Sequence, residues 1–180
     1  MFENRIKNVI RTIPNFPKKG IMFRDITTLL SDKKIFNEVV DYIASIAKKN
    51  KISKIIGIES RGFLFAAPVA YKNNIPLVLI RKKGKLPGDT YKAKYNLEYG
   101  NDQMEINKDS IKKNDTVMIV DDIIATGGTA LAASKLVRNT NSKIIDFVFL
   151  IELKGMPGIS KIQKLGDCCT ALSSFSEDES

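Results

Sequence analysis

The stretch Val117-Met-Ile-Val-Asp-Asp-Ile-Ile-Ala-Thr-Gly-Gly-Thr129 changes character twice over a short distance. Val117 to Val120 form an apolar run rich in β-branched residues, which is typical of a strand buried on both faces of a parallel sheet. Asp121 and Asp122 follow at once, so we expect them at the carboxyl end of a central strand, where open α/β sheets bind ligands. Ala130 to Val137 then have the composition of a helix. The glycines therefore lie in a strand-to-helix turn.

This turn has the properties of a phosphate-binding loop. Gly127 and Gly128 allow the backbone to approach a ligand closely, and the following helix start presents unpaired N–H groups and a positive dipole end. Thr126 and Thr129 add hydroxyl donors, and either could also cap the helix. The acidic pair should repel the same phosphate, so its presence indicates a partner such as ribose hydroxyls or a divalent cation.

The acidic pair followed by Ala125-Thr-Gly-Gly-Thr129 resembles the phosphoribosyl pyrophosphate (PRPP) signature of the type I phosphoribosyltransferases. A lone Gly-Gly turn is more often an ordinary loop, but here a buried strand, paired acids, a glycine turn and a helix occur in order. The resemblance implies that the acids bind the ribose hydroxyls, directly or as ligands of the Mg²⁺ that accompanies PRPP. The residues implied to bind PRPP or its nucleotide product at this point are Asp121, Asp122, Ala125, Thr126, Gly127, Gly128 and Thr129.

Length and composition indicate one α/β domain spanning residues 1–180. The chain has 180 residues, of which 43% are hydrophobic and 27% charged, as in ordinary globular proteins. No apolar run approaches the roughly 18 residues that span a bilayer, and the N-terminus lacks the apolar core of a signal peptide. We therefore expect a cytoplasmic protein with no membrane partner.

The chain contains no histidine and only two cysteines, the adjacent Cys168 and Cys169. The lack of histidine excludes Ser-His-Asp and Cys-His chemistry and histidine-ligated metals, so proton transfer must use a carboxylate, tyrosine, lysine or water. Adjacent cysteines strain disulfide geometry and lack the spacing of zinc ligands. We expect both to be reduced core residues of a late strand.

The formal net charge of +9 is compatible with nucleic acid, an anionic surface or small polyanionic substrates. Most lysines are scattered, which favours a solvated surface, but the cluster Arg81-Lys-Lys-Gly-Lys85 stands out. We find no basic patch interleaved with aromatic residues and no helix-turn-helix segment, so no nucleic-acid partner is expected.

Near the N-terminus, residues 2–13 have apolar residues at helical spacing and predict a first amphipathic helix that Pro14 ends. Residues 15–25 are predicted to form a loop, in which Phe23 is by itself more readily a core anchor than a ligand-stacking ring. The segment Gly-Ile-Met-Phe-Arg-Asp-Ile, however, resembles the base-binding segment of the adenine phosphoribosyltransferase family. That resemblance implies that Phe23 covers the purine, Met22 offers backbone hydrogen bonds and Arg24 helps to order the pocket.

A second strand, turn and helix follow a predicted helix from Ile35 to Ala47, which Ser31 should cap with Asp32 in the first turn. Lys54–Ile58 is the predicted strand, residues 59–62 the polar turn and residues 63–71 the apolar helix. The repeated pattern predicts a second anion site at the same sheet edge.

In that turn Arg61 would be a bidentate phosphate donor and Ser60 a neutral one, although a structural salt bridge from Arg61 is equally compatible with the residues alone. The run Glu-Ser-Arg-Gly-Phe-Leu-Phe resembles the pyrophosphate loop of the adenine phosphoribosyltransferase family, which carries a non-proline cis peptide.

Residues 81–106 are predicted to form a hood after the strand Ile75–Ile80. The basic segment 81–94 should be mobile, and residues 95–100 and 102–106 suit a hairpin bent at Gly100. Arg81-Lys-Lys-Gly-Lys-Leu-Pro-Gly88 resembles the start of the family's flexible catalytic hood, which excludes water. The resemblance assigns pyrophosphate contacts to Lys85, with help from Lys82, assigns Glu98 to the base, and places Tyr99 in the closed hood.

The remaining segments complete the domain. Lys143–Leu150 is an apolar strand, residues 155–165 are a short helix or loop, and residues 168–175 form a last strand. The acidic, serine-rich residues 173–180 are predicted to be a frayed tail.

The resemblance covers roughly residues 15–175 and implies a mostly parallel twisted sheet with helices on both faces and a β-hairpin hood. It implies conversion of adenine and PRPP to AMP and pyrophosphate, with Mg²⁺, in a homodimer, as in purine salvage. Glu98, Arg61 and Lys85 would be the catalytic residues. The alternatives are a nucleic-acid-binding regulator and an enzyme for another base, such as orotate or xanthine; residues 20–25 and 97–100 argue against both.

Overall fold

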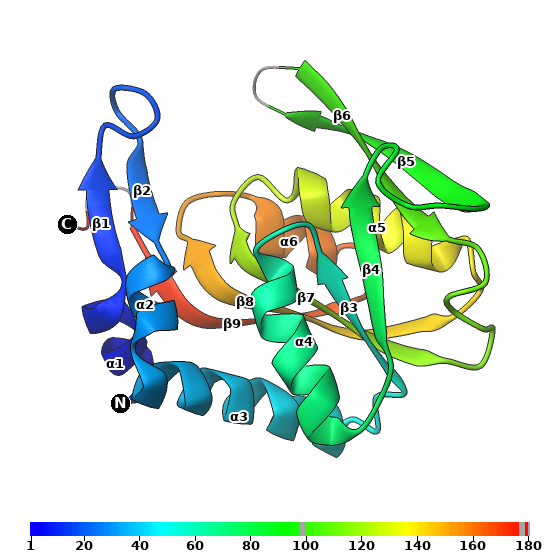
Figure 1. Ribbon diagram of the computed structural model, residues 1–180. Helices are drawn as coiled ribbons and strands as arrows, with labels where there is room; N and C mark the ends of the chain where they lie inside the picture. The colour runs from blue at the N-terminus through cyan, green and yellow to red at the C-terminus, as the bar shows by residue number, and fades with distance from the viewer. Residues whose placement is uncertain (98–99, 177–178, 180) are drawn as a thin grey trace.

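The computed structural model describes residues 1–97, 100–176 and 179, and these form a layered α/β structure (Figure 1). The helices are α1 (Phe2–Val9), α2 (Thr27–Ser31), α3 (Lys33–Lys49), α4 (Gly62–Asn73), α5 (Gly128–Arg138) and α6 (Gly158–Gln163). The strands are β1 (Arg11–Pro14), β2 (Met22–Asp25), β3 (Lys54–Ile58), β4 (Leu77–Lys82), β5 (Thr90–Leu97), β6 (Gly100–Asn107), β7 (Thr116–Ile124), β8 (Lys143–Leu153) and β9 (Cys168–Phe175). Among the described residues, no helix is both long and apolar enough to cross a membrane.

The main sheet has seven strands in the order β5-β6-β4-β3-β7-β8-β9. Strands β4, β3, β7, β8 and β9 run parallel, while β6 pairs antiparallel with both β4 and β5. One buried cluster packs α1, α3 and α4 against the sheet, and a second packs α5, α6 and the β5–β6 hairpin. This confirms the predicted fold class, with helices on both faces and a hairpin at one edge.

Strand β7 occupies the centre, as its sequence predicts. Val117 to Val120 are fully buried, because β3 and β8 flank the strand and helices cover both of its faces. The strand continues to Ile124, so Asp121 and Asp122 lie within its last part instead of after its end. The backbone of the acidic pair is therefore held by the sheet.

The N-terminal prediction is partly wrong. The first helix ends at Val9, because residues 11–14 pair antiparallel with residues 22–25 in a separate two-stranded sheet, placed at the far side from the hood (Figure 1). The predicted loop 15–25 therefore contains a strand. The cap of α3 is Asp32, not Ser31, since the Asp32 carboxylate accepts from the backbone N–H groups of Lys34 and Ile35.

The hood is more regular than predicted. Strand β4 extends to Lys82 and β5 begins at Thr90, so the irregular basic segment is shorter than residues 81–94. Asn107 Nδ2 donates to the Pro87 carbonyl at 2.6 Å and the Lys108 N–H donates to the Asp89 carbonyl, which fixes the entry to β5. Gly100 is the first residue of β6 and pairs with Leu97; the bend between them lies outside the described residues.

The C-terminal strand forms as predicted, but its cysteines do not lie in the core. Cys168 is exposed and Cys169 only partly buried, although burial raises the pKa of the Cys169 thiol to about 12. Residues 173–175 belong to β9, so the prediction that the frayed tail begins at residue 173 is wrong. Glu179 forms an ion pair with Lys7 on α1.

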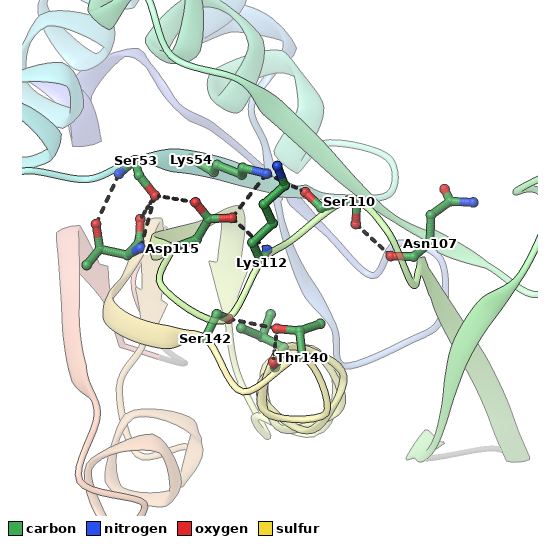
Figure 2. Close-up of polar contacts among 10 residues, drawn as sticks. Ser53, Lys54, Asn107, Ser110, Lys112, Asp115, Thr140 and Ser142 are labelled. Atoms are coloured by element: carbon green, nitrogen blue, oxygen red, sulfur yellow. Dashed lines mark hydrogen bonds and ion pairs between the residues drawn. The ribbon is translucent and has the colours of Figure 1, made fainter.

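The amino ends of β3 and β7 are locked by a polar network (Figure 2). Lys54 Nζ lies 3.1 Å from the Asp115 carboxylate and donates to the Ser110 carbonyl at 2.7 Å. Ser53 Oγ donates to the same carboxylate at 3.1 Å. Burial alone would raise the pKa of Asp115, but hydrogen bonds from the Lys112 N–H, Lys54 and Ser53 lower it. The two central strands are thus fixed in register at the end away from the acidic pair.

Candidate active site

The two predicted strand-turn-helix units meet at one edge of the sheet. Strands β3 and β7 are parallel neighbours, with Gly57 opposite Val120, so the turns that follow them lie side by side. A Cβ added at Gly62 would stand 2.7 Å from the Val120 carbonyl oxygen and 2.9 Å from Asp121 Oδ1. Only glycine therefore allows the first turn to pack directly on the acidic pair.

The acidic pair is buried, with Asp121 8% and Asp122 3% exposed. Burial, followed by repulsion from Asp122, raises the pKa of Asp121 well above its usual range. Burial also raises the pKa of Asp122, although the charge of Arg61 opposes this effect. The Asp122 N–H donates to Asp121 Oδ1 at 2.9 Å. The two carboxylates therefore attract cations and hydroxyl donors.

Arg61 joins three parts of the site. Its Nε lies 3.0 Å from Asp122 Oδ2, so the salt bridge that the sequence left open is present. The guanidinium carbon also lies 5.9 Å from the centre of the Phe23 ring. Because its side chain remains 41% exposed, Arg61 can still receive an anion while it neutralises Asp122.

The turn of residues 125–129, here called the phosphate turn after its predicted role, has at Gly127 the backbone conformation that glycine favours. Gly127 has φ +82° and is the N-cap of α5, and no side chain caps this helix. The alternative that Thr126 or Thr129 caps α5 is therefore wrong. Sequence reasoning also missed the contacts behind the turn, where α6 hydrogen-bonds to the carbonyls of residues 125 and 126.

The start of the hood is tied to the first turn through Glu59. Its carboxylate accepts from Arg81 at 3.0 and 3.3 Å and from the Lys82 N–H at 2.8 Å. Arg81 Nη1 also donates to the Lys85 carbonyl at 3.1 Å. Burial alone would raise the pKa of Glu59, but the hydrogen bonds from Arg81 and from the Lys82 N–H lower it. The peptide between Glu59 and Ser60 is cis, as the family resemblance implied.

Sequence reasoning missed the role of Arg81, because its partner lies 22 residues earlier. The contact brings Lys82 and Lys85, both implied pyrophosphate contacts, next to the turn that holds Ser60 and Arg61. The Lys85 side chain is exposed, and Lys82 Nζ lies 3.4 Å from Asp102 Oδ2. The backbone of this segment is therefore fixed next to the first turn, while both lysine side chains remain exposed.

The segment implied to bind the base lies on strand β2. The Phe23 ring contacts Phe16 edge to face, with centroids 5.0 Å apart, and is only partly buried. Met22 lies opposite Pro14, which has no N–H to donate to it. Arg24 is 3% exposed and donates to Thr12 and to the Ser176 carbonyl, so it orders this segment from behind. Burial lowers the pKa of Arg24.

Glu98 and Tyr99 lie outside the described residues, so their assigned roles stay predictions. Within the described part of the chain, no group of three His, Cys, Asp or Glu side chains could hold a metal ion. The acidic pair alone supplies two carboxylates, which suits a Mg²⁺ ion whose other ligands come from a substrate.

A family model described as a phosphoribosyl transferase domain matches residues 25–170, and the chain belongs to this family. An adenine phosphoribosyltransferase of Clostridium botulinum (strain Loch Maree / Type A3) is 51% identical over 158 residues, covering 88% of this chain and 92% of the relative. The chain thus falls among the adenine phosphoribosyltransferases of that family.

Solved structures agree. The crystal structure of adenine phosphoribosyltransferase from Thermoanaerobacter pseudethanolicus has a TM-score of 0.90 and 44% identity, covering 96% of this chain and 99% of that chain. The Saccharomyces cerevisiae enzyme, complexed with adenine and an imino-altritol bisphosphate, has a TM-score of 0.87 and 37% identity, covering 95% of this chain and 98% of that chain.

The raised pKa of Asp121 predicts that this carboxyl destabilises the fold at neutral pH. A carboxyl whose pKa is higher in the folded protein lowers stability as the pH rises from its unfolded value, about 3.9, through its folded value. Asp121→Asn removes this effect and keeps the oxygen that accepts from the Asp122 N–H. In thermal unfolding followed by circular dichroism, we expect a higher Tm than wild type near pH 8 and no difference near pH 3.

Asp102→Asn is the matched control. Hydrogen bonds from the Gln103 N–H, Tyr95 and Lys82 lower the pKa of Asp102, so its replacement should lower the Tm near neutral pH instead. A lower Tm of Asp121→Asn at every pH would contradict the interpretation of the acidic pair.

Proposed function

We propose that this protein transfers the phosphoribosyl group of PRPP to adenine, giving AMP and pyrophosphate, a step of purine salvage. The observation that carries the proposal is the contact between Arg61 and Phe23, because it joins the anion-binding turn to the segment implied to bind the base. The relatives named adenine phosphoribosyltransferase support the same reaction.

The site offers a separate binding group for each part of PRPP. The turn of residues 125–129 would hold the 5′-phosphate on the backbone N–H groups at the start of α5. Ser60, Arg61, Lys82 and Lys85 would hold the pyrophosphate, with Tyr99 closing the hood. Asp121 and Asp122 would accept hydrogen bonds from the ribose hydroxyls between these two anions.

We propose Mg²⁺ as the cofactor, carried by PRPP and held by Asp121 and Asp122. The fit rests on the burial of two adjacent carboxylates, because a nearby cation would offset the cost of burying their charge, which raises both pKa values. When bound, Mg²⁺ would neutralise charge on the departing pyrophosphate.

The chemistry is a displacement at the anomeric carbon of the ribose. The bond to pyrophosphate breaks as the bond to N9 of adenine forms, positive charge develops on the sugar, and the N9 proton passes to water or to the departing pyrophosphate. Arg61 and Lys85 would stabilise the negative charge on the leaving group. The acidic pair lies on the ribose side and would stabilise the developing positive charge. Holding the reactants in line supplies much of the acceleration.

The base would be held between the β1–β2 sheet and the hood. The partly buried Phe23 ring would cover the purine, and the Met22 carbonyl, which Pro14 cannot occupy, would accept from the adenine amino group. Arg24 would order the segment from behind. Glu98, closed under the hood, would donate a hydrogen bond to N7 while it is neutral, since burial favours the neutral form.

A second copy of this chain would complete the assembly as a homodimer. Helix α4 carries an apolar exposed stripe formed by Leu64, Ala67 and Tyr71, in which Leu64 is 44% and Tyr71 90% exposed. Their spacing places them on one helix face. Because Leu64 lies three residues after Arg61, contacts on this helix face would also support the turn that holds Ser60 and Arg61.

The reaction is tested by incubating the protein with PRPP, Mg²⁺ and, in turn, adenine, hypoxanthine, guanine, xanthine and orotate. We expect nucleotide and pyrophosphate to appear with adenine at the highest kcat/KM. Preference for another base would overturn the assignment of the base segment, and the absence of turnover with every base would favour a regulatory protein.

Glu98 is tested by two substitutions. Glu98→Gln keeps the shape and a hydrogen-bond donor, whereas Glu98→Leu keeps neither. General acid catalysis typically contributes about 10²- to 10⁴-fold, so Leu should lower kcat by much more than Gln and should change the acidic limb of the pH–rate profile. Equal small losses with an intact pH profile would indicate that Glu98 only orders the hood, for example by pairing with Lys85.

The dimer is tested by light scattering. We expect a particle of twice the chain mass of 20.1 kDa, and Tyr71→Lys should reduce it to the monomer because it places a charge in the apolar face. Leu165→Lys is the control, since Leu165 is exposed to the same extent as Leu64 but lies beyond α6. A wild-type monomer would refute the assembly.

A further inference from the structure

Helix α6 contacts the phosphate turn from behind. The Gly158 N–H donates to the Ala125 carbonyl at 2.9 Å, and Lys161 Nζ donates to the Thr126 carbonyl at 2.9 Å. A Cβ at Gly158 would stand 2.4 Å from the Ala125 oxygen, and one at Gly127 would stand 2.9 Å from the Gly158 Cα. Two glycines therefore allow α6 to reach two successive carbonyls of the turn.

These two bonds fix the direction of the peptide planes in the turn. In a trans peptide the C=O and the N–H of the same unit point to opposite sides. A carbonyl of residue 125 that points towards α6 turns the N–H of Thr126 away from it, and the carbonyl of residue 126 does the same for the N–H of Gly127. The donors of the turn are thus directed to the side opposite α6.

Lys161 adds charge to this geometry. None of the ion pairs found among the described residues involves Lys161, so a carboxylate does not neutralise its ammonium group there. A hydrogen bond from a charged donor is stronger than a neutral one, and it polarises the peptide so that the attached N–H becomes a better donor. The N–H polarised in this way belongs to Gly127, at the N-cap of α5.

We propose that Lys161 is a positioning residue for the 5′-phosphate: its bond to the Thr126 carbonyl holds and polarises the backbone donors of residues 126 and 127. The inference rests on the proposed function, since it assigns the 5′-phosphate to this turn. Lys161 acts from behind the turn and does not touch the substrate.

The rest of α6 is held independently of Lys161. Ile162 is fully buried in the second core cluster, and the Gly158 N–H retains its own bond to the turn. Loss of the ammonium group should therefore leave the helix in place and change only the phosphate turn. This separation makes the role of Lys161 measurable apart from folding.

The test compares Lys161→Met, which keeps the length of the side chain without its donor, with Lys161→Arg, which keeps a charged donor. A hydrogen bond to a charged group is worth enough to predict a rise of about ten- to hundredfold in the KM for PRPP for Met. The KM for adenine should change by less than about twofold, and Arg should restore much of the loss. Lys164→Met is the control, because Lys164 is exposed at the C-cap of the same helix.

A binding measurement separates this inference from the proposed reaction. Titration with ribose 5-phosphate, followed by calorimetry, should give a Kd that rises for Lys161→Met by the same factor as the KM for PRPP. If the wild type binds ribose 5-phosphate but turns over no base, the proposed function fails while the positioning role stands. If Lys161→Met binds ribose 5-phosphate as the wild type does, or differs from the wild type only by a lower Tm, the positioning role is overturned. If the Met variant does not fold, Lys161→Gln is used for the same comparison.

Discussion

Two adjacent carboxylates buried at the end of the central strand are the constraint around which this site is arranged. Burial raises the pKa values of Asp121 and Asp122, and repulsion from Asp122 adds to the rise at Asp121, so the acidic pair requires a compensating charge. Arg61 supplies this positive charge, with its Nε 3.0 Å from Asp122 Oδ2. Gly62 allows the turn that carries Arg61 to pack against the acidic pair. The guanidinium of the same arginine lies 5.9 Å from the centre of the Phe23 ring, so the first turn adjoins strand β2.

The binding groups of the site are held in place by hydrogen bonds to backbone carbonyls and carboxylates that face away from the ligand edge. The Glu59 carboxylate accepts hydrogen bonds from Arg81 and from the Lys82 N–H, and Arg81 also donates to the Lys85 carbonyl. These bonds attach the start of the hood to the first turn. Behind the second turn, α6 holds two carbonyls in the same manner. The groups that would touch phosphate are therefore fixed by groups that would not, which favours binding without reorganisation.

The sequence predicted what depends on local chemistry and missed what depends on distant partners. The strand, acids and glycine turn of residues 117–129 form as expected, because burial on both faces and a strand-to-helix turn leave a local pattern. The pairing of residues 11–14 with 22–25 overrode a helical pattern, which spacing alone cannot reveal. The bonds of Arg81 and Lys161 join residues 22 and 35 positions apart, so no local pattern could predict these partners.

The net charge of +9 explains less of the site than the placement of a few cations within it. A buried acidic pair repels phosphate, so a uniform positive surface would attract PRPP without orienting it. Arg61 pairs with Asp122, Lys82 and Lys85 follow β4 beside the first turn, and Lys161 lies behind the second turn. Cations thus lie on both sides of the acidic pair at this sheet edge. A ligand with two anionic ends and a hydroxylated centre would match that order, and a shift of such a ligand along the edge would place a phosphate on the carboxylates.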